Sequence, residues 1–335
     1  GLVPENQIFL GLADSTVVLF GGMFVVGAAM FYTGLAQKIG GGVVRMFGKG
    51  ENSLMFGIMI IAALMSAVLS NTGTTACLIP VVMGICANAK ISASRELMPL
   101  AFAAGLGGTI TLIGTPPNIL ANVALKAAGM PELQFGFFEY AWIGIPITIA
   151  GIVYMMFIGK YLLPKDSGTL NLEIEEEILE NETSTQKQII CGIIMVGVIG
   201  SMATGIVPLE IAAVVGAVIA VLTGCLTEKQ AYNSIDWVTI FLFAGMIPVA
   251  TAMNTSGAGK LIAEATVKML GGDPSPYMVT AVLFVLAVVL TQFMSNTASK
   301  ALLCPVGIAL SAQMGASPKA VLMAILIASS CAFAL

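Results

Sequence analysis

The sequence of 335 residues contains no histidine, and only 10% of its residues are charged. Histidine is the most versatile proton relay, general base and metal ligand near neutral pH, so its absence argues against such sites. Soluble domains contain about 25% charged residues, which is far more than this chain has to cover a water-exposed surface. These shortages exclude a soluble enzyme, a nucleic-acid-binding protein and a disordered protein. With 58% hydrophobic residues, the sequence predicts an all-α polytopic membrane protein.

The sequence also lacks any pair of cysteines with the spacing of a metal site. Its six cysteines stand singly in apolar stretches, at positions 77, 86, 191, 225, 304 and 331. We interpret them as small buried apolar side chains.

Charge is scarce and unevenly distributed. Residues 164–187 contain 7 of the 18 acidic residues, and the rest of the chain has 11 acidic and 12 basic residues. The net charge of −4 therefore comes from one segment, which we predict to be an acidic cytoplasmic linker. It says nothing about the charge of a substrate.

Long apolar runs dominate what is present. A transmembrane helix needs about 20 mostly apolar residues, and the candidates are 16–35, 96–113, 138–163, 188–206, 209–226, 237–253 and 318–335. Two further apolar regions, 54–87 and 276–313, are each interrupted in the middle by the tripeptide Ser-Asn-Thr. Each region predicts either two spans or one re-entrant hairpin with a polar tip at mid-membrane.

A third interruption, Gly114-Thr115-Pro116-Pro117-Asn118, follows the apolar run 96–113. Proline has no backbone N–H and glycine permits a tight turn, so the helix should end here. The apolar piece 119–128 then continues the run. We therefore predict a discontinuous transmembrane helix over 96–128.

The interrupted regions belong to an internal repeat, because 69–74 matches 294–299 at an offset of 225 residues. We expect a first half at 1–163, connecting transmembrane helices at 188–235 and a second half at 236–335. An odd number of predicted crossings separates the halves, so they should be inverted. Inverted repeats with broken helices are typical of secondary transporters. The distribution of Lys and Arg places the open ends of the first hairpin in the cytoplasm.

The two tripeptides have a chemistry suited to ions. Each precedes the second arm of its hairpin, so its amide and hydroxyl groups lie at a helix N-terminus, which favours an anion. Carbonyl groups exposed by a broken helix can coordinate Na⁺. Two tips facing each other across a pseudo-two-fold axis would form a neutral pocket for an oxyanion.

These motifs, with the string Asp-Trp-Val-Thr-Ile-Phe-Leu-Phe-Ala-Gly-Met at 236–246, resemble the divalent anion/sodium symporter family. That family comprises the di-/tricarboxylate and sulfate carriers of the ion-transporter superfamily. The resemblance implies a homodimeric, elevator-type, multi-pass carrier of the cell inner (plasma) membrane that couples Na⁺ to a divalent oxyanion. A C4-dicarboxylate is the expected anion because such substrates are frequent in the family. The implied substrate-binding residues are Ser70, Asn71, Thr72, Ser295, Asn296 and Thr297. The implied Na⁺ site comprises Ser70, Asn71, Gly114, Thr115, Pro116 and Asn118.

The sequence departs from that family at its ends. The repeat partner of 114–118 would fall at 339–343, beyond Leu335, and the family has one or two helices ahead of position 16. We therefore expect a chain truncated at both ends, without the second Na⁺ loop.

Lys300 is a further departure, since its partner in the first half is Thr75. A lysine at mid-membrane is costly and usually has a partner. One hypothesis is that its ammonium replaces the second Na⁺ or offsets the charge of the substrate, which would make the carrier an exchanger or less dependent on Na⁺. The alternative is that the side chain snorkels along the hairpin arm to water.

Other functions remain open. A sulfate or arsenite-type carrier would use similar donors. A Na⁺/H⁺ antiporter of the same superfamily needs a titratable group within the membrane, and the sequence places no Asp, Glu or His inside an apolar segment. A membrane-embedded enzyme would need a nucleophile–base pair, paired carboxylates or a metal, and the predicted spans contain none.

Overall fold

Every regular element of the computed structural model is a helix, over the residues that it describes, which are 9–47, 50–89, 91–163, 184–269 and 275–331. The prediction of an all-α protein is confirmed, whereas most of the predicted linker 164–187 lies outside the described residues. The helices in the amino-terminal part are η2 (Leu10–Ala13), α1 (Ser15–Tyr32), α2 (Leu35–Met46), α3 (Glu51–Ser66), α4 (Asn71–Ala89), α5 (Ala93–Gly107), η3 (Pro116–Ile119), α6 (Leu120–Ala127), η4 (Pro131–Leu133), α7 (Ala141–Tyr154), η5 (Met155–Gly159) and α8 (Lys160–Leu162). Those that follow are α9 (Thr185–Thr204), α10 (Leu209–Leu222), α11 (Glu228–Asn233), α12 (Trp237–Ser256), α13 (Ala258–Met269), α14 (Pro276–Thr291), α15 (Asn296–Met314) and α16 (Pro318–Ala328).

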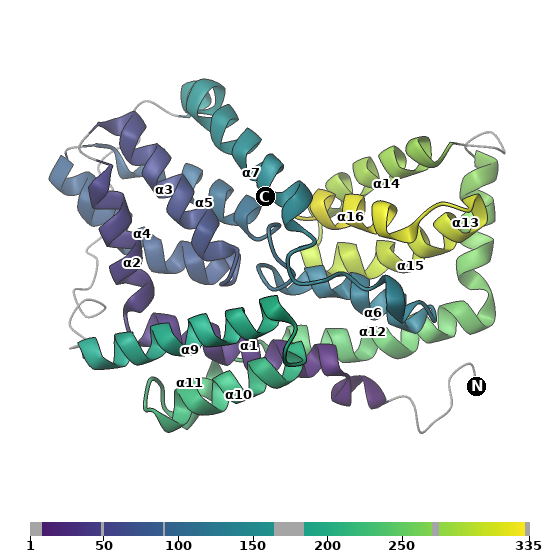
Figure 1. Ribbon diagram of the computed structural model, residues 1–335. Coiled ribbons are helices and arrows are strands. Elements are labelled where there is room, and N and C mark those ends of the chain that lie inside the picture. The colour runs from purple at the N-terminus through teal and green to yellow at the C-terminus, as the bar shows by residue number, and fades with distance from the viewer. Residues whose placement is uncertain (1–8, 48–49, 90, 164–183, 270–274, 332–335) are drawn as a thin grey trace. The chain divides into compact units, whose positions relative to one another are not determined.

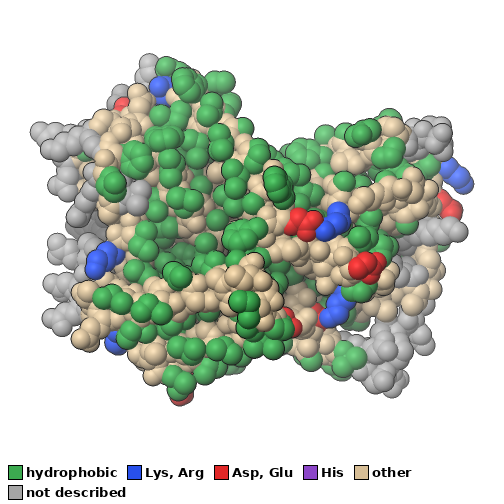
Figure 2. Space-filling view, in the orientation of Figure 1, with side chains coloured by type: hydrophobic (Ala, Val, Ile, Leu, Met, Phe, Trp, Pro, Cys, Tyr) green, Lys and Arg blue, Asp and Glu red, His purple; other side chains and the backbone are tan. Residues whose placement is uncertain are grey.

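Many of these helices are apolar on their outer surfaces as well as inside. Among the described residues, three helical segments are long and apolar enough to cross a membrane: Ser15–Tyr32, Ala141–Leu162 and Thr185–Thr204. Six shorter helices are also apolar. Along α7 and η5, Trp142 is 83% exposed and Phe157 is 72% exposed. Figure 2 shows one face on which hydrophobic side chains predominate and charged ones are few. Such a surface suits lipid rather than water.

The chain folds into two compact units. Unit 1 comprises residues 1–21, 116–140 and 236–335, and unit 2 comprises 22–115 and 141–235. In unit 1, α15 packs against α14, α16, α13 and α6 (Figure 1). In unit 2, α3 and α4 pack against α5, and α2 packs against both α3 and α4. Buried Leu54, Ile58, Leu78 and Leu100 contribute to the core of unit 2.

The helices of the second half repeat the order of the first. The helices α12 to α16 begin 222 to 225 residues after α1 to α5, respectively. Gly34 follows α1 with a φ of 70°, and Gly257 follows α12 with a φ of 74°. Both sites require the left-handed conformation that glycine adopts without strain. The repeat seen in the sequence is therefore also present in helix order and in this turn.

The interrupted helix begins and ends differently from the sequence prediction. The sequence predicts that it continues to residue 113, but α5 ends at Gly107 and helix resumes only at η3. A Cβ atom at Gly107 would lie 2.3 Å from the backbone oxygen of Ala63, so glycine is needed for α5 to approach α3 this closely. Residues 108–115 are irregular and follow directly on this contact.

Candidate functional site

The first hairpin consists of α3 and α4, joined by a short polar tip in unit 2. Ser70 caps α4, because its Oγ accepts a hydrogen bond of 3.1 Å from the backbone N–H of Gly73. Ser66 Oγ donates a hydrogen bond of 2.7 Å to Asn71 Oδ1. With its oxygen bonded to Ser66, the Asn71 side chain presents its NH₂ group as a donor. Ser70 and Asn71 are half-buried and Thr72 is exposed.

The second hairpin consists of α14 and α15 in unit 1, and its tip repeats this geometry. Ser295 Oγ accepts a hydrogen bond of 3.2 Å from the N–H of Ala298. Thr291 Oγ1 lies 2.7 Å from Asn296 Oδ1 and 2.8 Å from the backbone oxygen of Ser329, and these two acceptors share its single hydroxyl proton. The serine cap and the hydroxyl–asparagine contact thus occur at equivalent positions in the two halves, although the two tips belong to different units.

The irregular segment 108–115 passes beside the first tip. Thr111 Oγ1 donates to the backbone oxygen of Ala67 and accepts a hydrogen bond of 3.0 Å from the N–H of Gly114. A Cβ atom at Gly108 would lie 2.2 Å from Asn71 Oδ1, and one at Gly114 would lie 3.0 Å from the backbone oxygen of Ser66. Two glycines therefore let the backbone and its carbonyl groups approach the tip. Oxygen-rich surroundings of this kind suit a hard cation.

The predicted Na⁺ residues are divided between the two units. Four of them, Ser70, Asn71, Gly114 and Thr115, belong to unit 2. The other two, Pro116 and Asn118, belong to unit 1. Asn118 lies in η3, where its backbone oxygen accepts a hydrogen bond of 2.9 Å from the Tyr140 hydroxyl.

Lys300 lies inside unit 1 and does not snorkel. It is 0% exposed. Its Nζ donates hydrogen bonds to Asn118 Oδ1 at 3.0 Å and to Ser330 Oγ at 2.8 Å. The alternative in which this side chain extends along its hairpin arm to water is therefore wrong, because the ammonium turns toward η3 and the end of α16.

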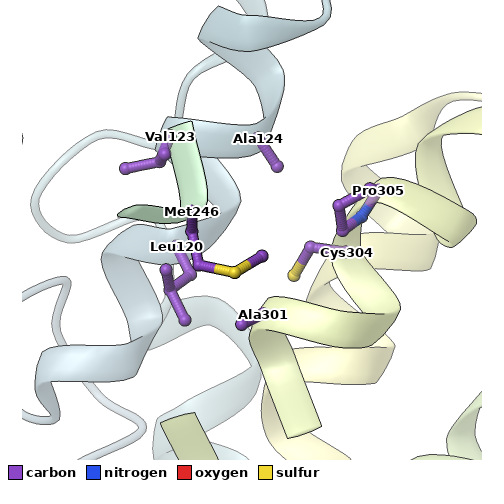
Figure 3. A pocket seen from close by; sticks show the side chains of 7 residues that line it. All are labelled: Leu120, Val123, Ala124, Met246, Ala301, Cys304 and Pro305. Carbon is purple, nitrogen blue, oxygen red and sulfur yellow. The ribbon is translucent and has the colours of Figure 1, made fainter. Parts of the chain in front are cut away.

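An apolar pocket lies on the same helix, between α15, α6 and α12. Figure 3 shows its lining, which consists of Leu120, Val123, Ala124, Met246, Ala301, Cys304 and Pro305. None of these side chains is charged, so the pocket offers little to an anion.

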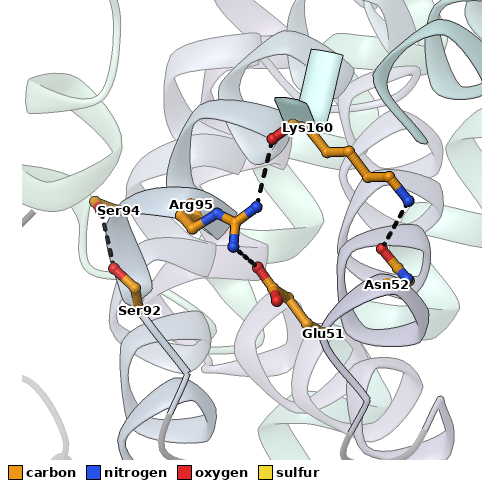
Figure 4. Close-up of polar contacts among 6 residues, drawn as sticks. All are labelled: Glu51, Asn52, Ser92, Ser94, Arg95 and Lys160. Carbon is orange, nitrogen blue, oxygen red and sulfur yellow. Dashed lines mark hydrogen bonds and ion pairs between the residues drawn. The ribbon is translucent and has the colours of Figure 1, made fainter. Parts of the chain in front are cut away.

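A polar cluster ties together the open end of the first hairpin, the start of α5 and α8 in unit 2 (Figure 4). Arg95 forms an ion pair of 2.5 Å with Glu51 and donates to the backbone oxygen of Lys160 at 3.4 Å. Lys160 Nζ donates to Asn52 Oδ1 at 3.2 Å. Arg95 and Lys160 belong to separate helices, α5 and α8, and this cluster brings them into contact.

Glu96, next to this cluster, is the first residue of the predicted span 96–113, and the structure encloses it although the sequence prediction placed no acidic residue inside an apolar segment. It is 0% exposed, and neither carboxyl oxygen has a hydrogen-bond partner among the described residues. Unpartnered buried carboxyl groups are rare and call for a functional or energetic account.

Sequence reasoning missed several polar residues of the site. Ser66 and Thr291 are separated by the repeat offset of 225, so a search for hydroxyl residues in the alignment of the halves would have found them. Thr111 and Ser330 gave no such signal, since their partners come from other helices.

Comparison with known proteins agrees with this architecture. A family model described as citrate transporter, CitMHS, matches residues 1–328. An uncharacterized transporter of Haemophilus influenzae is 30% identical over 354 residues, covering 100% of this chain and 75% of that protein. The uncharacterized transporter YfbS of Escherichia coli is 34% identical over 169 residues, covering 50% of this chain and 27% of that protein. The crystal structure of the Alcanivorax borkumensis YdaH transporter matches with a TM-score of 0.63 and 18% identity, covering 98% of this chain and 75% of that one. At this identity the likeness concerns the fold alone, which is that of a membrane transporter.

Proposed function

Because this chain belongs to the citrate transporter family, CitMHS, we propose that it is a secondary carrier that moves citrate or a related carboxylate anion across the cytoplasmic membrane. The family makes it a multi-pass membrane transporter and not an enzyme. The sequence resemblance pointed to the divalent anion/sodium symporters, which belong to the same superfamily. That prediction is therefore right for the superfamily, and the family is the citrate transporters.

One observation carries the proposal about the substrate. The two hairpin tips hold Asn71 and Asn296 in the same way, each with its side-chain oxygen 2.7 Å from a hydroxyl five residues earlier. Each asparagine can then donate its NH₂ group, beside hydroxyl groups at a helix N-terminus. Ser70 and Thr72 at the first tip, and Ser295 and Thr297 at the second, are further neutral donors for carboxylate oxygens. Residues 66–74 and 291–299 contain no Lys or Arg that could select among anions. We therefore choose citrate as the proposed substrate because of the family.

We further propose Na⁺ as the co-transported ion and Ser70, Asn71, Gly114 and Thr115 as its principal ligands. The close approach of 108–114 to the first tip supports this assignment, because it gathers backbone and side-chain oxygens there. Inverted halves, an elevator motion and a homodimer complete the proposal.

The test uses the full-length protein in proteoliposomes. We expect uptake of radiolabelled citrate to be driven by an inward Na⁺ gradient and reduced by unlabelled succinate. Asn71→Leu and Asn296→Leu should each reduce uptake at least tenfold, whereas Asn233→Leu, a matched change at an exposed position of α11, should retain it. If no carboxylate is taken up and sulfate alone is transported, the proposed substrate class is wrong.

Exchange of Na⁺ for H⁺ is a second candidate, because Glu96 supplies the enclosed carboxyl group that such a carrier requires. The same proteoliposomes decide between the two. Movement of Na⁺ driven by a pH gradient in the absence of citrate, and abolished by Glu96→Gln, would favour this candidate over citrate transport.

A further inference from the structure

The environment of Lys300 consists of neutral oxygen atoms from separate elements. Asn118 Oδ1 belongs to η3, and Ser330 Oγ follows the end of α16 and in turn donates to the backbone oxygen of Leu326 at 3.0 Å. Over the part of the chain that the structure describes, no carboxylate forms an ion pair with Lys300. An amide oxygen and a hydroxyl are the kinds of ligand that a transported alkali ion uses in a broken helix.

The first half has nothing comparable at the equivalent position. Thr75 is the repeat partner of Lys300, and its hydroxyl donates a hydrogen bond of 2.9 Å to the backbone oxygen of Asn71 in its own helix. The hydroxyl of Thr75 therefore has its hydrogen-bond partner within its own helix, whereas the ammonium of Lys300 bonds to residues of two other segments of unit 1. At this pair of positions the second half has an enclosed lysine, whereas the first half has a threonine.

The depth of Lys300 argues against direct contact with an anion at the tip. It lies four residues after Asn296, about one helical turn farther along α15. Ser295 at the tip is exposed, whereas Lys300 is fully buried. An enclosed ammonium without a carboxylate is costly, and an anion bound at the tip, close enough to feel its charge, would offset that cost.

We infer that the ammonium of Lys300 is a built-in cation that occupies Asn118 Oδ1 in place of a transported Na⁺. The inference rests on the proposed Na⁺-coupled transport of an anion. Asn118, assigned to Na⁺ from the sequence, is then a ligand of Lys300. The carrier needs one Na⁺ fewer per anion than it would with an uncharged residue at position 300.

The experiment measures the ratio of ²²Na⁺ to ¹⁴C-citrate taken up by proteoliposomes that contain the full-length protein. Lys300→Thr restores the residue type of the first half, and we expect the ratio to rise by about one. Lys300→Gln removes the charge but keeps a polar side chain, and should raise the ratio by the same amount. Lys300→Arg retains the charge and should keep the wild-type ratio.

The outcomes separate this inference from the proposed function. If the wild type takes up no carboxylate anion, the proposed function fails. If it takes up citrate and the ratio is the same in the wild type, Lys300→Thr and Lys300→Gln, only the role of Lys300 is overturned. Should both variants fail to fold, an experimental density map of the wild-type protein in the presence of Na⁺ tests the inference. A cation bound to Asn118 Oδ1 would overturn the inference, and contact with Lys300 Nζ alone would support it.

Discussion

The hydroxyl of Thr291 lies 2.7 Å from the side-chain oxygen of Asn296, and this contact orients the asparagine at the second hairpin tip. Thr291 is buried at the end of α14, and its hydroxyl also lies 2.8 Å from the backbone oxygen of Ser329. The orientation of the amide therefore depends on a residue in the opposite arm of the hairpin.

Thr291→Val should weaken anion transport without removing any residue proposed to touch the anion. Valine keeps the shape of threonine and removes the hydroxyl, so Asn296 loses its partner, at a cost of about 1 kcal/mol or about fivefold in apparent affinity. The measurement is the citrate concentration that gives half-maximal uptake. Thr291→Ser retains the hydroxyl and serves as the control. Equal values for the valine and serine variants would contradict the proposed orientation.

Gly108→Ala should disturb the first tip directly. The added Cβ would lie 2.2 Å from Asn71 Oδ1 and 2.4 Å from Thr115 Cγ2. Overpacking of this kind costs about 1–3 kcal/mol, and we expect a lower melting temperature together with weaker uptake. Gly84→Ala in α4 is the matched control, because among the described residues no atom beyond its chain neighbours and its own helix backbone lies within 4 Å of the added Cβ. A Gly108→Ala variant as active and stable as Gly84→Ala would show that the close approach is unimportant.

The sequence predicted the all-helical architecture and the two polar tips, because apolar length and a repeated tripeptide are local signals. It predicted the end of α5 wrongly, and the close approach of Gly107 to Ala63 at this end involves another element. It also left the direction of the Lys300 side chain open. That direction depends on Asn118 and Ser330, which are 182 and 30 residues away in the chain. Long-range partners of this kind leave no periodicity in the sequence.

Asp14 should make the stability of unit 1 depend on pH. Burial acts to raise the pKa of this carboxyl, but hydrogen bonds from Lys126 and Thr16 outweigh burial and hold the pKa below its ordinary value. A carboxyl with a lowered pKa stabilises the fold above its unfolded pKa of about 3.9, and this contribution is lost as the pH falls through the folded value.

We therefore expect Asp14→Asn to reduce stability at about pH 7, by no more than about 1 kcal/mol because Lys126 is half exposed, and to have little effect at about pH 3. Asparagine caps a helix about as well as aspartate, so this variant isolates the ion pair. Melting temperatures at the two pH values provide the measurement. A loss of the same size at both would mean that charge contributes nothing.

Replacing Glu96 by leucine should stabilise unit 2. The carboxyl group is enclosed without a hydrogen-bond partner among the described residues, and an unsatisfied polar group costs about 1–3 kcal/mol. Thermal unfolding of the purified protein should shift to higher temperature. Glu51→Gln, which removes the partner of Arg95, should shift it to lower temperature. A fall for Glu96→Leu as large as that for Glu51→Gln would show that Glu96 has a partner in the full-length protein.

The enclosed ammonium of Lys300 also makes membrane voltage relevant to the empty carrier. A neutral binding site that moves through the membrane does no electrical work, but α15 carries a fixed charge with it wherever it moves. Moving one elementary charge through 100 mV corresponds to about 2.3 kcal/mol. If α15 moves across even part of the membrane, the resting potential would favour one orientation of the unloaded protein over the other. The return step of the cycle would then respond to voltage, although no ion or anion is bound.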